Sequence, residues 1–364
     1  MVARQEDQAR GGGTRVTGET VAVRANAGFD EAKLIAWLND NVPGFEGPLS
    51  VSQFAGGQSN PTFLLTTPAR RYVMRRKPAG PVLKGAHAVD REARVITALE
   101  GLGYPVPHIH ALCADDAVIG SWFYVMDHVE GRIFWDGTFG SVPKEGRADY
   151  MAAMNAVQAR LHTLDPLAAG LEDYGSTRNY FSRQAALWSR QYRSDEEAGR
   201  NADMDFLAEW LDTVTPPEAE RRVVHGDFRC DNLIFHESEP RVIAVLDWEL
   251  STIGDPLVDF AYHLMMYHAP ASMKWSLAGK DLAALGLPSE DEYIAAYCRN
   301  TGREAVPDLR PYLALNLFRF AAILHGIKGR MIRGNAASGE AADMVRNLDD
   351  FARSARGIVE GMRA

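Results

Sequence analysis

The feature that most constrains the fold is a change of hydrophobic period near residue 131. Before it, three short alternating segments (49–54, 62–67 and 70–77) are separated by turn-forming AGGQSNP and PAR, which predicts three antiparallel strands. After it, apolar residues recur at helical spacing in six longer segments. These are 149–164, 181–192, 203–211, 259–267, 290–299 and 309–333. The sequence therefore predicts an α+β, bilobal chain, with a small antiparallel-sheet lobe followed by a larger, mainly helical lobe.

Further patterns set the expected boundaries. FDEAKLIAWLNDNV predicts a helix with Asp30 as its cap, HAVDREARVITALEGLG predicts a second, and SWFYVMDHVEG predicts a strand that runs into a loop. In the second lobe only RRVVHGD, NLIFHE and RVIAVLDW predict strands. We expect a flexible tail over 1–26, a first lobe over 27–126, a connector over 127–131 and a helical lobe over 132–364.

Composition limits the partners. The 364 residues carry a net charge of -9, which argues against general binding to nucleic acid or to an anionic membrane and favours a small-molecule partner. The sequence contains no run of about 18 apolar residues, so no membrane span is predicted. The N-terminal stretch lacks the apolar core of a signal peptide. Three widely spaced cysteines indicate reduced thiols, and we expect a cytoplasmic protein.

The stretch VVHGDFRCDNLIF, residues 223–235, concentrates polar groups between two apolar runs. It contains the pattern H-G-D-x4-N, and Asp247 follows fifteen residues after Asn232. If NLIF and IAVL pair as a hairpin, Asn232 and Asp247 lie side by side and offer the oxygen ligands that Mg²⁺ prefers. Asp227 lies on the loop that leads into this hairpin, where it could accept the proton of a hydroxyl that attacks a phosphate.

These residues resemble the aminoglycoside phosphotransferase family, whose fold is similar to that of protein kinases. Kinases carry H-R-D-x4-N and a later D-F-G, and HGDFRCDN and LDW take those places here. The resemblance implies that Asp227 is the catalytic base and that Asn232 and Asp247 bind Mg²⁺. Arg229 would neutralise the transferring phosphate or pair with Asp231.

The resemblance also implies supporting roles on the same loop. His225 would orient the loop through hydrogen bonds. Asp259, in STIGDPLVDFAY, would brace the loop, and Asp255 would do likewise or cap the following helix.

An ATP site in the first lobe is implied too. FAGGQSNPTFLL would cover the phosphates, with close backbone approach at Gly56 and Gly57 and donors from Ser59 and Asn60. Arg75 stands where these kinases usually have lysine, and it would pair with Glu92 on the next helix. Lys77 is the other candidate, since alternation directs it to the same face as Arg75 and directs Arg76 to the opposite face.

The adenine site would lie at the connector. Backbone groups of Asp127, His128 and Val129 would bind the adenine edge, and Met126 would be the residue before the connector.

The resemblance is closest to the phosphotransferase domain attached to, or encoded near, some acyl-CoA dehydrogenases. It rests on YVMRRKPAG, FYVMDHVEGRIFWD and VIAVLDWELSTIGDPLVD. That subgroup implies phosphorylation of a hydroxyacyl-CoA, notably a 4-hydroxyacyl-CoA, and a functional link to such a dehydrogenase. A CoA thioester would need basic and aromatic groups, for which the helical lobe offers Arg183, Trp188, Lys328 and Arg330. Each of these is also typical of an ordinary helix, and basic residues near a helix end are favoured by its dipole.

Three other hypotheses remain at this point. In the first, the phosphoryl acceptor is an aminoglycoside or another small alcohol. In the second, the protein is a non-catalytic nucleotide-binding regulator, a hypothesis motivated by Arg75 in the position of the usual lysine. A metal-dependent hydrolase that uses His225, Asp227 and Asp247 as ligands would leave the glycine-rich segment and the connector unexplained.

Overall fold

The structure is a computed structural model that describes residues 20–24, 27–55, 60–78, 88–217, 220–334 and 339–363. It divides into two compact units. The first, here called the sheet unit, comprises residues up to 134 together with 231–251, and the second, the helical unit, comprises 135–230 and 252–364. The α+β class predicted from the sequence is confirmed.

The sheet unit contains a six-stranded antiparallel sheet with the order β1-β2-β3-β4-β6-β5. Its strands are β1 (Thr20–Val21), β2 (Ser50–Phe54), β3 (Thr62–Thr66), β4 (Arg71–Arg76), β5 (Ile109–Cys113) and β6 (Phe123–Asp127). The three strands predicted over 49–77 are present. Strand β1 falls within the stretch expected to be a tail, where Thr20 pairs with Phe54 and Val21 with Gln53. A two-residue strand is too short to produce a recognisable hydrophobic period.

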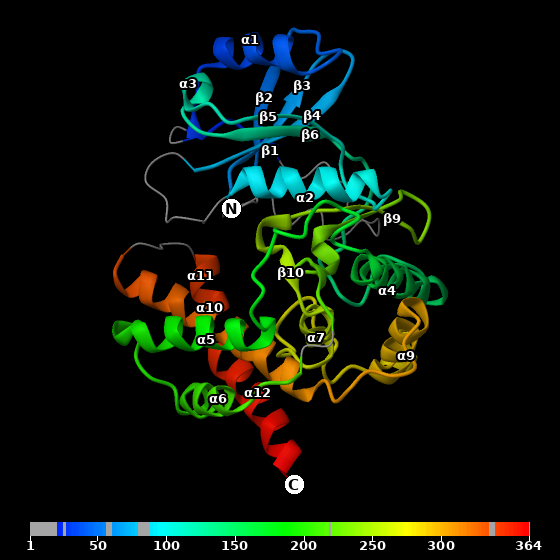
Figure 1. Cartoon of the computed structure of the whole chain (residues 1–364), viewed down its shortest axis with the longest axis vertical. Coiled ribbons are helices and arrows are strands. Elements are labelled where there is room, and N and C mark those ends of the chain that lie inside the picture. Colours follow the sequence, from blue (N-terminus) through cyan, green and yellow to red (C-terminus); the bar gives the residue numbers. More distant parts are fainter. Residues whose placement is uncertain are drawn as a thin grey trace. The chain divides into compact units, whose positions relative to one another are not determined.

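Helices cover both faces of this sheet (Figure 1): α1 (Glu31–Asn41) and α3 (Asp116–Ile119) lie on one face, and α2 (Val89–Gly101) lies on the other. Helix α1 begins as predicted, because the Asp30 carboxylate accepts hydrogen bonds from two backbone N–H groups of the first turn. Its buried Leu34 and Leu38 join an apolar cluster with residues of β3, β4 and β6.

Side chains of β4 alternate as the sequence predicts. Arg75 and Lys77 reach carboxylates of α2, with ion-pair distances of 2.9 Å to Glu92 and 3.8 Å to Asp90. Arg76 is 2% exposed and lies over the Phe29 ring on the other face of the sheet. The strand therefore presents Arg75 to the face that α2 covers.

A two-stranded hairpin completes the sheet unit. It consists of β8 (Leu233–Phe235) and β9 (Val242–Val245), in which Leu233 pairs with Val245. Gly131 packs against this hairpin, since an added Cβ there would lie 2.2 Å from the Phe235 carbonyl oxygen.

The helical unit is organised around α10 (Arg310–Ile332), which packs against α5 (Tyr180–Ser194), α7 (Pro256–Leu264) and α12 (Leu348–Arg363). Figure 1 shows α10 among these helices. The other helices are α4 (Arg147–Thr163), α6 (Ala202–Thr213), α8 (Leu282–Leu285), α9 (Glu290–Thr301) and α11 (Gly339–Val345). The six predicted helices are present, whereas α8, α11 and α12 were not predicted. Strands β7 (Arg222–Val224) and β10 (Thr252–Gly254) pair antiparallel.

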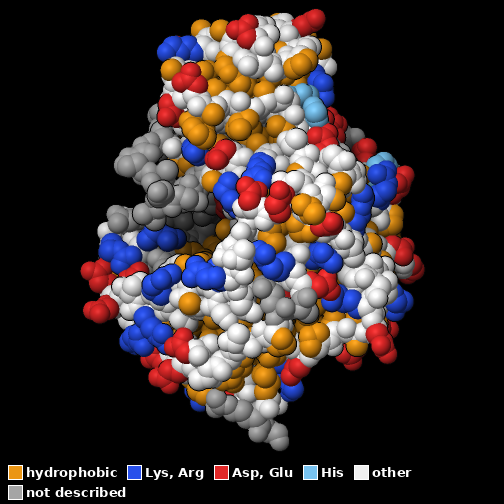
Figure 2. All heavy atoms as spheres, in the orientation of Figure 1, with side chains coloured by type: hydrophobic (Ala, Val, Ile, Leu, Met, Phe, Trp, Pro, Cys, Tyr) orange, Lys and Arg blue, Asp and Glu red, His pale blue; other side chains and the backbone are white. Residues whose placement is uncertain are grey.

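Three further features bear on function. Cys113, Cys230 and Cys298 are buried and form no disulfide. None of the helices in the described ranges combines the length and apolarity needed to cross a membrane. Acidic and basic side chains are interspersed over the face drawn in Figure 2.

Candidate functional site

The loop that follows β7 is held through its backbone. Both N–H groups at its start donate to the Asp259 carboxylate, from His225 at 3.1 Å and from Gly226 at 2.6 Å. On the other side, an Nη2 group of Arg319 donates to the Gly226 carbonyl at 2.8 Å. Gly226 has a φ of 84°, a left-handed conformation that favours glycine. The Asp259 carboxylate therefore holds the start of the loop through two backbone N–H groups.

The charge of Asp259 is compensated locally. Burial by itself would raise the pKa of this carboxyl, but the His162 ring at 3.1 Å, together with His225 and the Gly226 N–H, lowers it to about 2. The group is thus an anion at neutral pH. Three donors to a fully buried carboxylate make a rigid anchor for the loop.

Asp227 is positioned by its neighbours. Its backbone N–H donates to Nδ1 of His225 at 3.2 Å, and its Oδ1 accepts a hydrogen bond of 2.5 Å from the Tyr262 hydroxyl. Nε of Arg229 lies 3.4 Å from the same Oδ1. Burial, with the adjacent Asp227 charge, raises the pKa of Tyr262 well above its ordinary value. The phenol therefore stays protonated and acts as a donor to the carboxylate.

Tyr262 and Arg319 were not identified in the sequence. Arg319 is 4% exposed, and its guanidinium lies 5.6 Å from the Trp188 ring centroid and 4.9 Å from that of Tyr262. A signal existed in LNLFRFAAIL, where a single arginine interrupts an apolar helix, because a buried arginine requires partners. For Tyr262 nothing local distinguishes it from other core tyrosines.

In the sheet unit, the hairpin brings Asn232 and Asp247 to one end. The Leu246 N–H donates to the Asn232 carbonyl at 2.9 Å, so Leu246 lies opposite Asn232. Asp247 is the next residue in the chain. Asp247 has a φ of 65°, which is unusual for a residue with a Cβ. This is the juxtaposition expected from the sequence.

The donor set at this hairpin end consists of a carboxylate and a carboxamide. Both supply the hard oxygen atoms that suit Mg²⁺. No group of three or more His, Cys, Asp or Glu side chains that could hold a metal exists among the residues with described positions. The set therefore fits a cation that keeps much of its coordination for water or phosphate, and not an all-protein cage.

Arg75 lies at the centre of an acidic cluster in the sheet unit. Its guanidinium is 2.9 Å from Glu92, 2.6 Å from Asp247 and 3.2 Å from Glu249. Although burial opposes its charge, these carboxylates and Tyr124 raise the pKa of Arg75 above its ordinary value. The pairing with Glu92 is as expected, whereas Glu249 was not identified in the sequence.

Glu92 differs from Asp259 in the direction of its net pKa shift. Its side chain is 2% exposed and receives hydrogen bonds from Asn60 at 2.8 Å and from the Tyr124 hydroxyl at 3.1 Å. Burial raises the pKa of Glu92 to about 7, even though Arg75 opposes that shift. This carboxyl therefore changes charge close to neutral pH.

Asn60 requires a correction. We expected Asn60 to offer a donor to phosphate, whereas in this structure the residue is 0% exposed and its side-chain amide donates to Glu92. A buried amide must satisfy its hydrogen bonds within the protein, so Asn60 positions the carboxylate in this structure. The neighbouring candidates Gly56, Gly57 and Ser59 lie outside the described residues.

At the connector, Met126 is 9% exposed and pairs with Val73 across the sheet. The Asp127 N–H already donates to the His108 carbonyl at 2.9 Å. The Asp127 carboxylate binds Arg70 and His110, at 2.6 Å and 2.8 Å. No acceptor within the described ranges takes the backbone N–H of His128 or Val129. The backbone N–H groups of His128 and Val129, just after β6, are therefore available as donors, whereas the N–H of Asp127 is engaged with the His108 carbonyl.

The four acceptor-site candidates do not form one cluster. Arg183 lies over the Tyr180 ring, and its Nε and Nη2 have no hydrogen-bond partner within the described part of the chain. Trp188 donates to Gln184 at 3.0 Å and contacts Arg319. Lys328 is half-buried and Arg330 is exposed, at the far part of α10.

Comparison with known proteins places this geometry in a family. Residues 50–312 match the model of the phosphotransferase enzyme family. The chain is 44% identical over 346 residues to acyl-CoA dehydrogenase family member 11 of Gallus gallus. The aligned region covers 90% of this chain and 44% of that relative. The chain thus spans less than half the length of that relative.

Two solved structures resemble the chain. A protein of Ralstonia eutropha, provisionally named an aminoglycoside phosphotransferase, is 45% identical, with a TM-score of 0.83 over 92% of this chain and 99% of its own. A spectinomycin phosphotransferase solved with ADP and spectinomycin shares the fold at 9% identity, with a TM-score of 0.59 over 90% of this chain and 98% of its own. The chain belongs to the phosphotransferase enzyme family and has the protein-kinase-like α+β fold of these enzymes.

Proposed function

We propose that the protein transfers the γ-phosphoryl group of ATP to a hydroxyl of a small molecule and that Asp227 is the catalytic base. The observation that carries this proposal is the way the Asp227 carboxylate is held. Tyr262 and Arg229 contact one of its oxygens, and Asp259 fixes the backbone of the loop that bears it. A base must be held in place for proton transfer to be efficient.

The reaction balances with the groups present. The acceptor oxygen attacks the γ-phosphorus, a new O–P bond forms, and the bond between that phosphorus and the bridging oxygen of ADP breaks. The hydroxyl proton passes to the Asp227 carboxylate. Arg229 would offset charge on the transferring phosphoryl group, since a guanidinium binds phosphate oxygens in a planar fork.

Asn232 and Asp247 would hold Mg²⁺, as their shared position at the end of the hairpin supports. When bound, this ion neutralises phosphate charge during the transfer. One oxygen of Asp247 is paired with Arg75 at 2.6 Å. Arg75 would contact the phosphates in place of the usual lysine while Glu92 keeps it oriented.

Nucleotide binding would use the connector. The backbone N–H groups of His128 and Val129 suit the acceptor edge of a purine, whereas that of Asp127 is engaged in the sheet. The ADP in the spectinomycin phosphotransferase supports nucleotide use by this fold.

For the acceptor, we propose a hydroxyacyl-CoA, of the 4-hydroxyacyl type. Relatives of this chain carry an acyl-CoA dehydrogenase name and are more than twice its length, which suggests that the two activities act on one substrate. Phosphorylation converts a poor leaving group, hydroxide, into a good one. The open donors of Arg183 would suit a phosphate of CoA.

The test measures ADP release with ATP, Mg²⁺ and a panel of 4-hydroxyacyl-CoAs, aminoglycosides and simple alcohols. We expect turnover with the CoA thioesters and little with the other classes. Preference for an aminoglycoside would contradict the acceptor class. ADP release with no member of the panel would contradict the phosphotransferase proposal and favour a nucleotide-binding regulator.

A further inference from the structure

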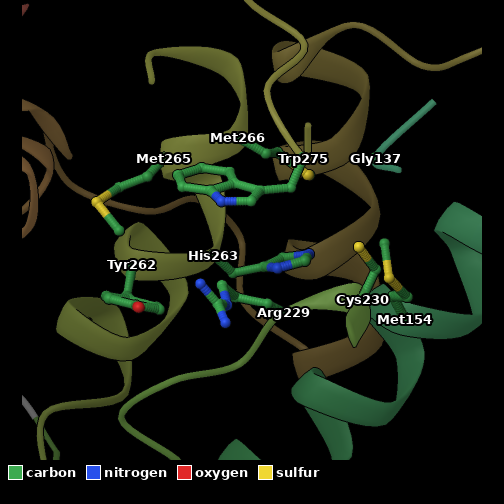
Figure 3. A pocket seen from close by; sticks show the side chains of 9 residues that line it. All are labelled: Gly137, Met154, Arg229, Cys230, Tyr262, His263, Met265, Met266 and Trp275. Carbon is green, nitrogen blue, oxygen red and sulfur yellow. The ribbon is translucent and has the colours of Figure 1, made fainter. Parts of the chain in front are cut away.

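A small cavity in the helical unit adjoins the proposed base. Its volume is about 20 Å³, room for one water-sized or methyl-sized group. Met154 of α4, Met265 and Met266 after α7, Cys230 and Trp275 form most of its wall, and we call it the methionine pocket. Figure 3 shows these side chains around the hollow, with Arg229 and Tyr262 beside them.

Two wall residues connect the methionine pocket to Asp227. Tyr262 donates to Asp227 Oδ1 at 2.5 Å, and Nε of Arg229 lies 3.4 Å from the same atom. A group in this pocket is therefore separated from the base by a single layer of side chains. Tyr262 and Arg229 thus contact both the pocket and the Asp227 carboxylate.

The wall chemistry selects against a polar or cationic occupant. None of the nine lining residues is acidic, and Arg229 is the one with a full charge. Burial lowers the pKa of His263 to about 4, so that ring is neutral at pH 7. Both of its nitrogens are engaged, with the Phe228 carbonyl at 3.1 Å and the Tyr293 hydroxyl at 2.7 Å. An amino group of a polycationic sugar would meet no counter-charge there.

The walls differ in stiffness. An added Cβ at Gly137 would lie 2.3 Å from the Trp275 carbonyl oxygen, so the backbones pack closely and that side cannot retreat. Three methionines, Met154, Met265 and Met266, also line the pocket, and their unbranched side chains adapt to ligands of different length. The pocket can therefore widen to accept a chain longer than one carbon.

We propose that the methionine pocket receives the alkyl group carried by the hydroxyl-bearing carbon of the acceptor, so that the enzyme selects secondary alcohols over primary ones. This rests on the proposed function and adds a specificity determinant to it. An aliphatic group leaves water when it enters such a pocket, and one methylene there typically changes kcat/KM by about tenfold or more.

The test compares kcat/KM for 4-hydroxypentanoyl-CoA, whose hydroxyl carbon bears a methyl group, with that for 4-hydroxybutanoyl-CoA, whose hydroxyl carbon bears none. We expect the wild type to favour the secondary alcohol. Met154→Phe, which fills the pocket, should lower the ratio of the two values by about tenfold. Met154→Ala, which enlarges it, should shift preference toward 4-hydroxyoctanoyl-CoA.

Met204→Phe is the matched control, since Met204 is equally buried, in α6 and outside the pocket. It should leave the ratio unchanged, and thermal unfolding of each variant reports whether it is folded. An unchanged ratio in Met154→Phe and unchanged chain-length preference in Met154→Ala would overturn the pocket assignment alone. Absence of turnover by the wild type with either thioester would instead overturn the proposed acceptor.

Discussion

Two buried carboxylates, Asp259 in the helical unit and Glu92 in the sheet unit, have pKa values that are shifted in opposite directions, although burial by itself raises both. Asp259 accepts from two backbone N–H groups and a histidine, and its pKa falls to about 2. Glu92 accepts from Asn60 and Tyr124 and pairs with Arg75, yet its pKa rises to about 7.

The difference lies in what compensates each charge. Backbone donors at Asp259 are fixed by the fold and serve that carboxylate. Arg75 is shared by Glu92, Asp247 and Glu249, so each receives part of one positive charge, and the two other carboxylates add to the rise at Glu92. The loop that bears Asp227 is therefore held by donors that serve one carboxylate, whereas the three carboxylates around Arg75 share one cation.

Breaking the fixed anchor should have the largest effect on stability. Asp259→Asn leaves a buried N–H without its acceptor and removes a paired charge, which should cost about 4 kcal/mol in the free energy of unfolding. Denaturant unfolding would measure the loss, and hydrogen exchange over residues 222–230 should become faster. Asp255→Asn is the control, because Asp255 caps α7 through the Leu257 N–H, and its change should cost about 1 kcal/mol. An equal loss in both variants would contradict the anchor.

Breaking the shared cluster should cost less. Arg75→Met leaves Glu92 buried without its cation, at a cost of about 3 kcal/mol, part of which protonation of Glu92 can offset. The KM for ATP should rise at least tenfold. Arg71→Met is the control, since its partner Glu130 is 67% exposed, and it should cost less than about 1 kcal/mol. A normal KM for ATP in Arg75→Met would contradict Arg75 as the residue that contacts the phosphates and would favour Lys77 instead.

The two carboxylates should also differ in their pH dependence. The folded pKa of Glu92 lies above its ordinary value of 4.5, so its contribution to stability is present below about pH 4.5 and is lost as pH rises through 7, a change of about 3 kcal/mol. Asp259 has a lowered folded pKa, so its contribution is present above pH 3.8 and is lost as pH falls toward 2. Denaturant unfolding between pH 5 and 8 should show a slope that Glu92→Gln removes. A slope that survives this substitution would assign it to another group.

The smallest effect sharpens the role of the Asp227 neighbours. Tyr262→Phe removes one hydrogen bond, which should cost about 1 kcal/mol of stability and lower kcat about tenfold, with the KM for ATP unchanged. Tyr267→Phe is the control, because Tyr267 lies just after α7, the helix that bears Tyr262. It loses a hydrogen bond of 3.2 Å from its hydroxyl to the Pro288 carbonyl and should leave kcat unchanged. Equal kcat values in the two variants would show that Tyr262 only supports the fold.

Local patterns in the sequence were sufficient to predict several of the contacts around Arg75 and Asp247. Strand alternation predicted that Arg75 and Lys77 share one face of the sheet, and the family resemblance implied the pairing of Arg75 with Glu92. The spacing between Asn232 and Asp247 predicted that they share a hairpin end. Contacts across long stretches of sequence were beyond such patterns. The Tyr262 hydroxyl and Asp227 are 35 residues apart, and Arg319 and Gly226 are 93 apart. Nothing local in the sequence reveals that the Asn60 amide is buried against Glu92.

The most direct measurement is ADP release by Asp227→Asn in the presence of ATP, Mg²⁺ and 4-hydroxypentanoyl-CoA. The asparagine keeps the shape of the side chain but cannot take a proton, so kcat should fall by a factor of at least about a hundred. The affinity for ATP should stay within about twofold of the wild type, since the proposed nucleotide contacts lie elsewhere. Turnover by Asp227→Asn at the wild-type rate would contradict the assignment of Asp227 as the base.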